Sequence, residues 1–223
     1  MSSEAMRKME RRGTPFERWF ANGYDWLFAR FDARGGVDLR RRVVEGAVGK
    51  VLEIGAGTGR NLALYRNASQ VVGLEPDAGM RERAEAAARN ALVTVELVDG
   101  VAEALPFPEG TFDTVVASYV LCTVADPDKA LTEVRQVLRP GGTLRFLEHV
   151  RARDPRLARW QDRLERPWRW LGRGDHPNRD TVAAIVRAGL DIVEIDAFDF
   201  EPFPRLVRPH VLGIAEPTPP GPA

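Results

Sequence analysis

The chain contains little cysteine and lysine and has no long apolar segment. Cys122 is its single cysteine, which excludes an internal disulfide and a metal cluster built on several thiolates, and we expect no metal site. No run approaches the roughly 20 apolar residues that cross a bilayer. The opening segment "MSSEAMRKMERRG" lacks the apolar core of a secretory signal. These absences predict a cytoplasmic protein, and peripheral contact with the inner membrane surface stays open.

An excess of charge of one sign is also missing. The 32 basic residues balance the 32 acidic ones, so no global field favours nucleic acid, and we expect no nucleic-acid partner. Apolar residues make up 44% of the chain and charged residues 29%, which is typical of a soluble globular protein. A length of 223 residues suits one domain with a full core.

Strand-like and helix-like segments alternate from Lys50 onward. The segments typical of strands are "KVLEI", "QVVGLE", "VTVELV", "FDTVVASYVL" and "GTLRFLEHV". The segments typical of helices are "RNLALYR", "AGMRERAEAAARN" and "DPDKALTEVRQVL". Such alternation predicts an α/β fold, in which helices cover both faces of a mostly parallel sheet.

The two ends of the chain have other patterns. Residues 15–48 carry aromatic residues at helical spacing and then a second helix ending at Gly49, which together predict a helical lid. Residues 155–174 predict a helical insertion interrupted at Pro167. A helix capped by Asn178 and two paired strands, "LDIVEIDAF" and "LVRPHVLGIA", should follow. We expect disorder in residues 1–14 and 216–223.

The segment "VLEIGAGTGRNLALY" places three glycines on alternate positions directly after a buried strand. Gly55, Gly57 and Gly59 permit backbone angles and a close ligand approach that a β-carbon would block. Glu75 ends the next strand, twenty residues after Gly55, where an acid can accept hydrogen bonds from two ribose hydroxyls. The bland alternative is a tight turn with a surface acid. The spacing favours a nucleoside ligand.

Two details distinguish the ligand from a nicotinamide dinucleotide. The dinucleotide turn has Gly-x-Gly-x-x-Gly, whereas Arg60 occupies the sixth position here. Glu53 precedes the turn, where an acid is unfavourable beside a pyrophosphate and favourable beside an ammonium group. Both details favour a ligand with an adenosine half and an amino-acid half.

These motifs resemble those of class I methyltransferases that depend on S-adenosylmethionine. "VLEIGAGTG" resembles their first motif and "GLEPDAGM" the second. "GVAEALPFPEGTFDTVVASYVL" is similar to the adenine-side loop and fourth strand, and "EVRQVLRPGGTLRFLEH" to the helix and turn before the fifth strand. The resemblance implies a Rossmann-like three-layer sandwich with a seven-stranded, mostly parallel sheet, an antiparallel C-terminal strand pair and N-terminal lid helices. It also implies S-adenosylmethionine as cofactor and S-adenosylhomocysteine as product.

The resemblance implies cofactor-binding roles for four groups of residues. The first turn would hold the methionine half through Glu53, Gly55, Ala56, Gly57, Thr58, Gly59 and Asn61. Glu75 would bind the ribose, with Pro76 and Met80 near the adenine. The adenine rim would consist of Gly100, Val101, Ala102 and Glu103. Ser118, Tyr119 and Val120 would line the cofactor at the end of the fourth strand, and Tyr24 would close over it.

The adenine rim departs from the family at one position. Many relatives have an aspartate where Val101 stands, and it binds the adenine amino group. Glu103 or Asp99 are the candidates to replace that contact here.

Three histidines are candidates for a catalytic base, with a structural role as the alternative for each. His149 ends the fifth strand, at the edge of the sheet where ligands bind in α/β proteins. His176 follows an aspartate in a loop, and His210 lies on the last strand. A base is needed only if the acceptor arrives protonated.

The methyl acceptor is indicated by the last third of the chain. "LEHV", "RPW" and "RPH" are similar to the thiol S-methyltransferase branch, whereas "YDWLFARF" resembles bacterial phospholipid and quinone methyltransferases. Leucine and tryptophan recur every three or four residues between positions 157 and 171, flanked by arginines. They predict either a helix facing the core or a hydrophobic lid that touches an anionic membrane.

The sequence therefore predicts a methyltransferase acting on a small, rather apolar acceptor: a thiol first, then a lipid amine or a quinol. Two alternatives stay open. One is a nicotinamide-dependent oxidoreductase on a related sheet, and the other is a protein that binds the cofactor without turnover.

Overall fold

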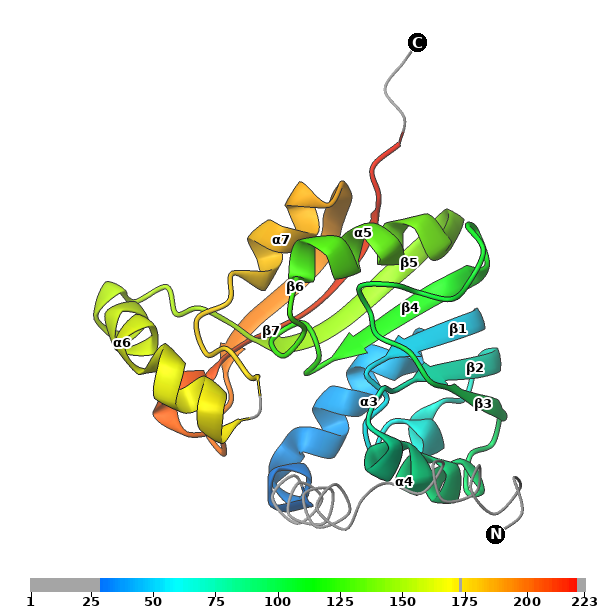
Figure 1. Cartoon of the computed structure of the whole chain (residues 1–223), viewed down its shortest axis with the longest axis horizontal. Helices are drawn as coiled ribbons and strands as arrows, with labels where there is room; N and C mark the ends of the chain where they lie inside the picture. The colour runs from blue at the N-terminus through cyan, green and yellow to red at the C-terminus, as the bar shows by residue number, and fades with distance from the viewer. Residues whose placement is uncertain (1–28, 173, 220–223) are drawn as a thin grey trace, which may run out of the picture.

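The computed structural model describes residues 29–172 and 174–219, and a seven-stranded sheet forms its centre (Figure 1). The strands are β1 (Gly49–Ile54), β2 (Ala68–Leu74), β3 (Thr94–Val98), β4 (Phe112–Ser118), β5 (Leu138–His149), β6 (Leu190–Asp199) and β7 (Pro209–Pro217). Their order across the sheet is β3-β2-β1-β4-β5-β7-β6. Strands β1 to β5 are parallel, and β7 pairs antiparallel with β5 and β6. The predicted mostly parallel sheet with its antiparallel C-terminal pair is confirmed.

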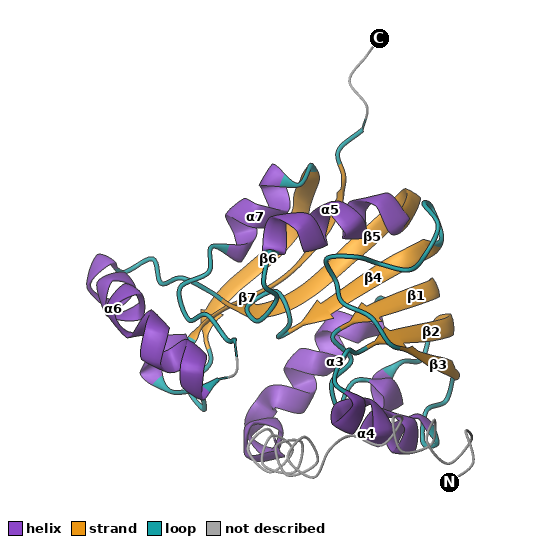
Figure 2. Cartoon of the chain, in the orientation of Figure 1, coloured by secondary structure: helices purple, strands orange, loops and turns teal. Residues whose placement is uncertain are grey.

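Helices cover both faces of the sheet, as predicted (Figure 2). On one face lie α3 (Val37–Glu45) and α4 (Ala78–Ala88), and on the other lie α5 (Pro127–Val137) and α7 (Thr181–Arg187). Leu52 and Ile54 of β1 belong to the core on the α5 side, whereas Val51 belongs to the core on the α3 side. A strand covered on both faces has apolar residues in succession, which explains the unbroken apolar run before the glycine turn.

The N-terminal lid is described only in part. Residues 15–28 of the predicted lid lie outside the described residues, and so does Tyr24. The described part consists of a short π-helix, η1 (Asp32–Gly36), and α3. The predicted end of the second helix at Gly49 is wrong: α3 ends at Glu45, and Gly49 begins β1 with a φ of 66°.

Four of the helices in the described part of the chain begin with an aspartate whose side chain accepts hydrogen bonds from the first turn. The capping residues are Asp77 for α4, Asp126 for α5, Asp154 for α6 (Pro155–Leu171) and Asp180 for α7. Such a carboxylate satisfies backbone N–H groups that have no partner inside the helix. The predicted cap of α7 at Asn178 is wrong, because Asp180 accepts the hydrogen bond from the backbone N–H of Ala183 at 3.1 Å.

Three further expectations differ from the structure. The helix expected over residues 60–66 is a short 3₁₀ turn, η2 (Leu62–Leu64). The helix α6 continues through Pro167 instead of breaking there. The strand β7 includes Glu216 and Pro217, the first residues of the tail expected to be disordered, because both pair with the start of β6.

The helix α6 lies beside the ends of β6 and β7, away from the two helical layers (Figure 1). It contacts the short 3₁₀ helix η3 (Arg205–Val207). Within residues 29–172 and 174–219, no helix combines the length and the apolar composition needed to span a membrane.

Candidate functional site

The glycine turn follows β1 at the point where the sheet order changes direction, because β2 lies on one side of β1 and β4 on the other. In open α/β sheets this is the place where ligands bind. Gly55, Gly57 and Gly59 have φ values of 62°, 57° and 81°. Gly57 lines a pocket, and a β-carbon on it would meet only the carbonyl oxygen of Gly55, at 3.9 Å. Gly57 is therefore the glycine of the turn that is open to a ligand, whereas a β-carbon on Gly55 would meet Val120 at 2.4 Å and one on Gly59 would meet Ala87 at 2.9 Å.

The pocket is formed by three parts of the chain: α3, the turn after β1, and the end of β4. Its lining consists of Arg40, Glu53, Gly55, Ala56, Gly57, Thr58, Arg60, Asn61 and Ser118. The structure thus brings together six residues predicted from the first motif and one predicted from the fourth strand, whereas Gly59 of the predicted set is not part of the lining.

Glu53 is a buried carboxyl group at the base of the pocket. The Asn61 side-chain amide donates to Oε1 at 2.7 Å, and the Tyr65 hydroxyl donates to Oε2 at 2.9 Å. Burial raises the pKa of Glu53 to about 7, although these hydrogen bonds and the nearby Arg40 act in the opposite direction. Near neutral pH the group can gain or lose its charge, which suits an acid that meets an ammonium group only when a ligand binds.

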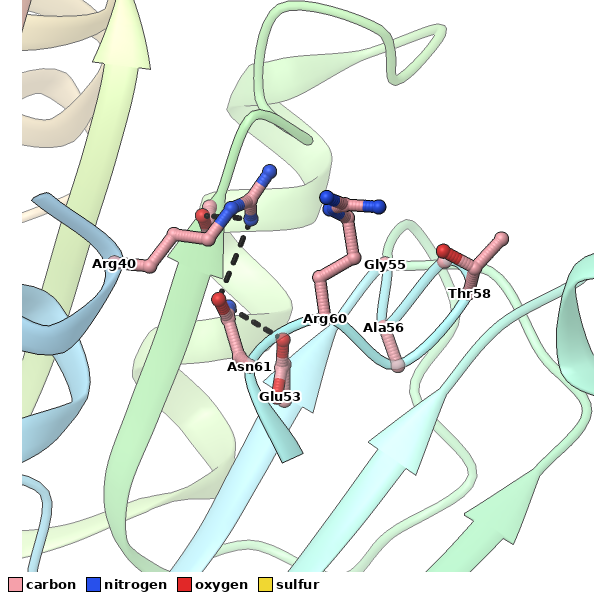
Figure 3. Close-up of a pocket in the computed structure, with 9 residues that line it drawn as sticks. Arg40, Glu53, Gly55, Ala56, Thr58, Arg60 and Asn61 are labelled. Atoms are coloured by element: carbon pink, nitrogen blue, oxygen red, sulfur yellow. Dashed lines mark hydrogen bonds between the residues drawn. The ribbon is translucent and has the colours of Figure 1, made fainter. Parts of the chain in front are cut away.

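Two arginines line the same pocket, and Asp32 joins them. Arg40 lies 3.1 Å from Asp32 through Nε and donates to Asn61 through Nη1 at 3.3 Å. Arg60 donates to the other oxygen of Asp32 from Nε at 2.8 Å and also from Nη2. Figure 3 shows the guanidinium groups of Arg40 and Arg60 at the same side of the pocket. Guanidinium groups are suited to binding a carboxylate.

Sequence reasoning missed the roles of Arg40 and Asp32. Arg40 is the first of three consecutive arginines in α3. The sequence alone does not show which of the three faces the pocket, because that depends on how the helix is oriented. In the sequence, Arg60 stands out only as a departure from the dinucleotide pattern. Its position inside the turn was the available signal for a pocket residue.

Glu75 directly follows β2 and contacts the glycine turn. Its Oε2 accepts a hydrogen bond from the backbone N–H of Gly57 and its Oε1 one from the N–H of Asp77, both at 2.9 Å. Burial raises the pKa of Glu75. The carboxyl group therefore holds the turn in place from the end of β2. Pro76 follows Glu75 at that strand end, and Met80 lies in the first turn of α4.

The adenine-rim residues follow β3. Ala102 is buried, while Val101 is exposed. Glu103 accepts hydrogen bonds from the backbone N–H groups of Ala125 at 2.8 Å and Asp126 at 3.3 Å. The other replacement candidate, Asp99, pairs with Arg81 at 3.3 Å. Gly100 lies between Asp99 and Val101 in this loop.

A buried acid, which sequence reasoning missed, fixes the end of β4. The carboxylate of Glu148 accepts from the N–H groups of Val120 and Leu121 at 2.9 Å and from that of Cys122 at 3.3 Å. Burial raises the pKa of Glu148. Tyr119 has a φ of 55°, and among the described residues it is the one non-glycine residue with positive φ. Tyr119 directly follows Ser118, which lines the pocket. The strained backbone therefore lies at the edge of the pocket, where strained residues are often found in functional sites.

An aromatic cluster adjoins the pocket through Tyr119. The ring centroid of Tyr119 lies 5.7 Å from that of Phe203 and 5.6 Å from that of His210. Phe198 and Phe200 lie 5.8 Å and 5.7 Å from His210. We call Tyr119, Phe198, Phe200, Phe203 and His210 the aromatic cluster. It gives the molecule an apolar region beside the polar pocket.

His149 and His210 are cross-strand partners on β5 and β7. Nδ1 of His210 lies 2.7 Å from the Arg208 carbonyl oxygen. A carbonyl only accepts, so Nδ1 carries the hydrogen and Nε2 keeps a lone pair. Nε2 is buried and has no hydrogen-bond partner among the described residues. Burial lowers the pKa of His210 to about 4, so the ring is neutral at pH 7.

His149 belongs to a hydrogen-bonded chain. Its Nε2 lies 2.8 Å from one oxygen of Asp175, and the indole N–H of Trp168 donates to the other at 2.8 Å. The ligand atoms of Cys122, His149 and Asp175 lie within 4.8 Å of one another, an arrangement that the sequence did not predict. The short nitrogen–oxygen distance is that of a hydrogen bond.

His176 is separate from the other two candidates. Its Nδ1 lies 3.0 Å from Glu165 of α6, and its backbone N–H donates to the carbonyl of Cys122. Burial lowers the pKa of His176. These contacts attach the loop to α6.

Comparison with known proteins decides the family. Residues 52–146 match the family model described as a methyltransferase domain. The chain is 34% identical over 170 residues to "Thiol S-methyltransferase TMT1B" of Rattus norvegicus, an alignment that covers 74% of this chain and 69% of that protein. The chain belongs to the S-adenosylmethionine-dependent methyltransferases. This result decides against the nicotinamide-dependent alternative.

The methyltransferase is similar to proteins that act on different acceptors. It is 34% identical over 146 residues to "Phosphatidylethanolamine N-methyltransferase" of Cereibacter sphaeroides, covering 62% of this chain and 68% of that protein. Its fold matches a solved geranyl diphosphate methyltransferase in complex with SAM, with a TM-score of 0.62 at 14% identity, over 79% of this chain and 83% of the other.

S-adenosylmethionine is the cofactor of this methyltransferase. The pocket fits that molecule in its chemistry. Gly57 has no β-carbon to hinder close approach, and Glu53 offers a carboxyl group for an ammonium. The guanidinium groups of Arg40 and Arg60, which also contact Asp32, line the same pocket and suit a carboxylate.

Proposed function

We propose that this methyltransferase transfers a methyl group by in-line displacement to a small, rather apolar acceptor, with a thiol favoured over a lipid amine or a quinol. When bound, S-adenosylmethionine supplies an electrophilic methyl group on a good leaving group. The protein then has to align the acceptor and exclude water, and proximity alone can contribute about 7–11 kcal/mol.

The cofactor would be held by the pocket and the two strand ends beside it. Glu53 would bind its ammonium group, and Arg40 with Arg60 would bind its carboxylate. Glu75 would accept hydrogen bonds from the ribose hydroxyls while it supports the turn. The loop that contains Gly100, Val101, Ala102 and Glu103 would border the adenine. Tyr24 keeps its expected role as a closing residue, and it lies outside the described residues.

The aromatic cluster carries the proposal for the acceptor. It adjoins the cofactor pocket through Tyr119, and Arg40 of the pocket lies 5.4 Å from the Tyr119 ring centroid. Aromatic rings favour an apolar acceptor and leave little water near the reacting atoms. The names of the two relatives include a thiol and a lipid amine, so they support an apolar acceptor without choosing between these two.

His210 favours a neutral protic acceptor within that class. Its Nε2 is a buried acceptor atom without a partner among the described residues, and a thiol S–H or a hydroxyl can donate to it. A low pKa makes His210 a weak base, so its role is to position the acceptor and take its proton as the displacement proceeds. His149 would support it from the neighbouring strand.

A labelled methyl donor offered with an alkyl thiol, phosphatidylethanolamine or a reduced quinone tests the proposal. We expect the thiol to be methylated fastest. No turnover of any acceptor by protein that binds S-adenosylhomocysteine would support the alternative of a binding protein. Preferred methylation of the lipid amine or the quinol would reject the thiol.

The variant His210→Asn tests the proposed role of Nε2. Asparagine can still donate to the Arg208 carbonyl but has no acceptor at the position of Nε2. We expect kcat/KM for the thiol to fall by about a hundredfold, the lower range for acid–base groups, with unchanged S-adenosylhomocysteine affinity. An unchanged kcat/KM would leave His210 a structural residue.

A further inference from the structure

The helix α6 presents an apolar surface to solvent. Trp160 is 54% exposed, Leu164 37%, Trp170 84% and Leu171 72%. Trp160, Leu164 and Leu171 recur at spacings of four and seven residues, so they lie along one side of the helix. Large apolar side chains at these exposures are unfavourable in water unless a partner covers them. These residues belong to the segment for which the sequence predicted either a helix facing the core or a hydrophobic lid.

A single polar residue fixes which side of α6 faces the protein. Gln161 is fully buried, accepts from the N–H of Ala152 at 2.8 Å, and donates to the carbonyls of Val150 and Leu206 at 3.2 and 2.9 Å. Trp168, on the same side, donates to Asp175. These contacts anchor the inner side of α6, and the exposures of Trp160, Leu164 and Leu171 show that the neighbouring stripe stays open to solvent.

Four arginines lie along one flank of the apolar stripe. Arg156, Arg159, Arg163 and Arg166 are exposed, and none of them forms an ion pair with another described residue. The acids of α6 are already paired: Asp162 with Arg151, and Glu165 with Arg169 and His176. The whole chain has no net charge, so this positive surface is local to α6.

We propose that α6 docks on an anionic lipid surface, with Trp160, Leu164, Trp170 and Leu171 inserted at the interface and the arginines on the phosphate groups. Helices that lie in a membrane interface combine tryptophan and leucine with basic residues in this way. The charge complementarity between unpaired arginines and anionic head groups selects lipid over an uncharged partner. The proposal concerns attachment and does not depend on which acceptor is methylated.

The position of α6 gives this docking a consequence for catalysis. Trp168 of α6 is connected through Asp175 to His149, which lies across from His210 of the aromatic cluster. A membrane bound to the outer side of α6 would therefore lie next to the acceptor side of the molecule. An apolar acceptor dissolved in the bilayer would be concentrated there.

Flotation of the full chain with lipid vesicles tests the proposal. One vesicle type contains phosphatidylcholine alone, and the other contains phosphatidylcholine and phosphatidylglycerol in equal parts. We expect binding to the anionic vesicles that weakens as salt is raised, and little binding to the neutral ones. Equal recovery with both vesicle types, or no binding to either, would overturn the proposal.

Variants assign the binding to α6. We expect Trp170→Ser with Leu171→Ser to lower the vesicle affinity by about tenfold or more, the range for removing large buried apolar groups. Arg159→Glu with Arg163→Glu should lower it by about fivefold or more for each arginine removed. The matched controls, Leu92→Ser and Arg89→Glu, change exposed residues near the end of α4 and should bind as the wild type does. Unchanged binding of both α6 variants would refute the assignment.

A second copy of the chain is the competing occupant of this surface. Light scattering of the wild type and of Trp170→Ser with Leu171→Ser decides between them. We expect a monomer in both cases. A wild-type dimer that dissociates in the variant would overturn the lipid proposal.

Discussion

The charge of the pocket changes with pH near neutrality because of Glu53. Burial raises its pKa from 4.5 to about 7. Between these two values the folded protein holds a proton that the unfolded chain has released, so the contribution of Glu53 to the free energy of unfolding decreases as pH rises through this window. Above about pH 7 the carboxylate is ionised and can pair with an ammonium group.

Cofactor affinity should therefore rise with pH in the neutral range. Below the pKa of Glu53, binding an ammonium group requires the loss of a proton, so the affinity for S-adenosylhomocysteine should fall by up to about tenfold per pH unit. Isothermal titration calorimetry from about pH 6 to about pH 8 measures this. The control Glu53→Gln should bind weakly with a flat profile. A flat profile in the wild type would remove Glu53 from the ammonium site.

Residues were predictable where the signal is local in sequence. Gly57 and Glu53 were found because a turn and its preceding strand lie within one short motif. Arg40 and Glu148 were not found, because the contacts that place them in the site, to Asn61 for Arg40 and to the start of the loop after β4 for Glu148, are 21 to 28 positions away and only the folded sheet brings them together. A buried acid inside an apolar strand was the available signal for Glu148.

At the scale of elements, aspartate caps set where four helices begin, and one of them offers a matched test. Asp180→Ala should reduce the free energy of unfolding by about 1 kcal/mol, the usual effect of a lost N-cap. Asn178→Ala, the cap expected from the sequence, should change it by less than about 0.5 kcal/mol because it removes an exposed contact. Urea unfolding measures both free energies. A larger loss of stability in Asn178→Ala than in Asp180→Ala would indicate that Asn178 is the cap after all.

Elements were predictable in type and less so in extent. The apolar strands and the helical segments that became α4 and α5 lie in strong local patterns. Pro167 suggested a break because proline lacks the N–H of a helix interior, yet α6 continues past it. The inner contacts of Gln161 and Trp168, on either side of Pro167, hold the helix to the protein, and these contacts could not be read from the sequence.

At the scale of the molecule, the sheet order explains why distant residues form one site. The strands β1 and β4 are neighbours, so the glycine turn and Ser118 meet at the same edge. The β5–β7 pair then brings His149 and His210 beside that edge. The layered fold followed from the alternating pattern, whereas the outward stripe of α6 required the tertiary contacts.

The most direct test of the account is whether the bare glycine turn holds the cofactor. Gly57→Ala places a β-carbon in the pocket, and Gly110→Ala imposes the same left-handed strain, at a φ of 61°, where nothing lies within 4 Å. Both variants should lose about 1–2 kcal/mol of stability.

Calorimetric titration with S-adenosylhomocysteine separates the two variants. We predict that Gly110→Ala binds as the wild type does, while Gly57→Ala loses about tenfold or more in affinity, which is at least about 1.4 kcal/mol. Wild-type affinity in a folded Gly57→Ala protein would contradict it.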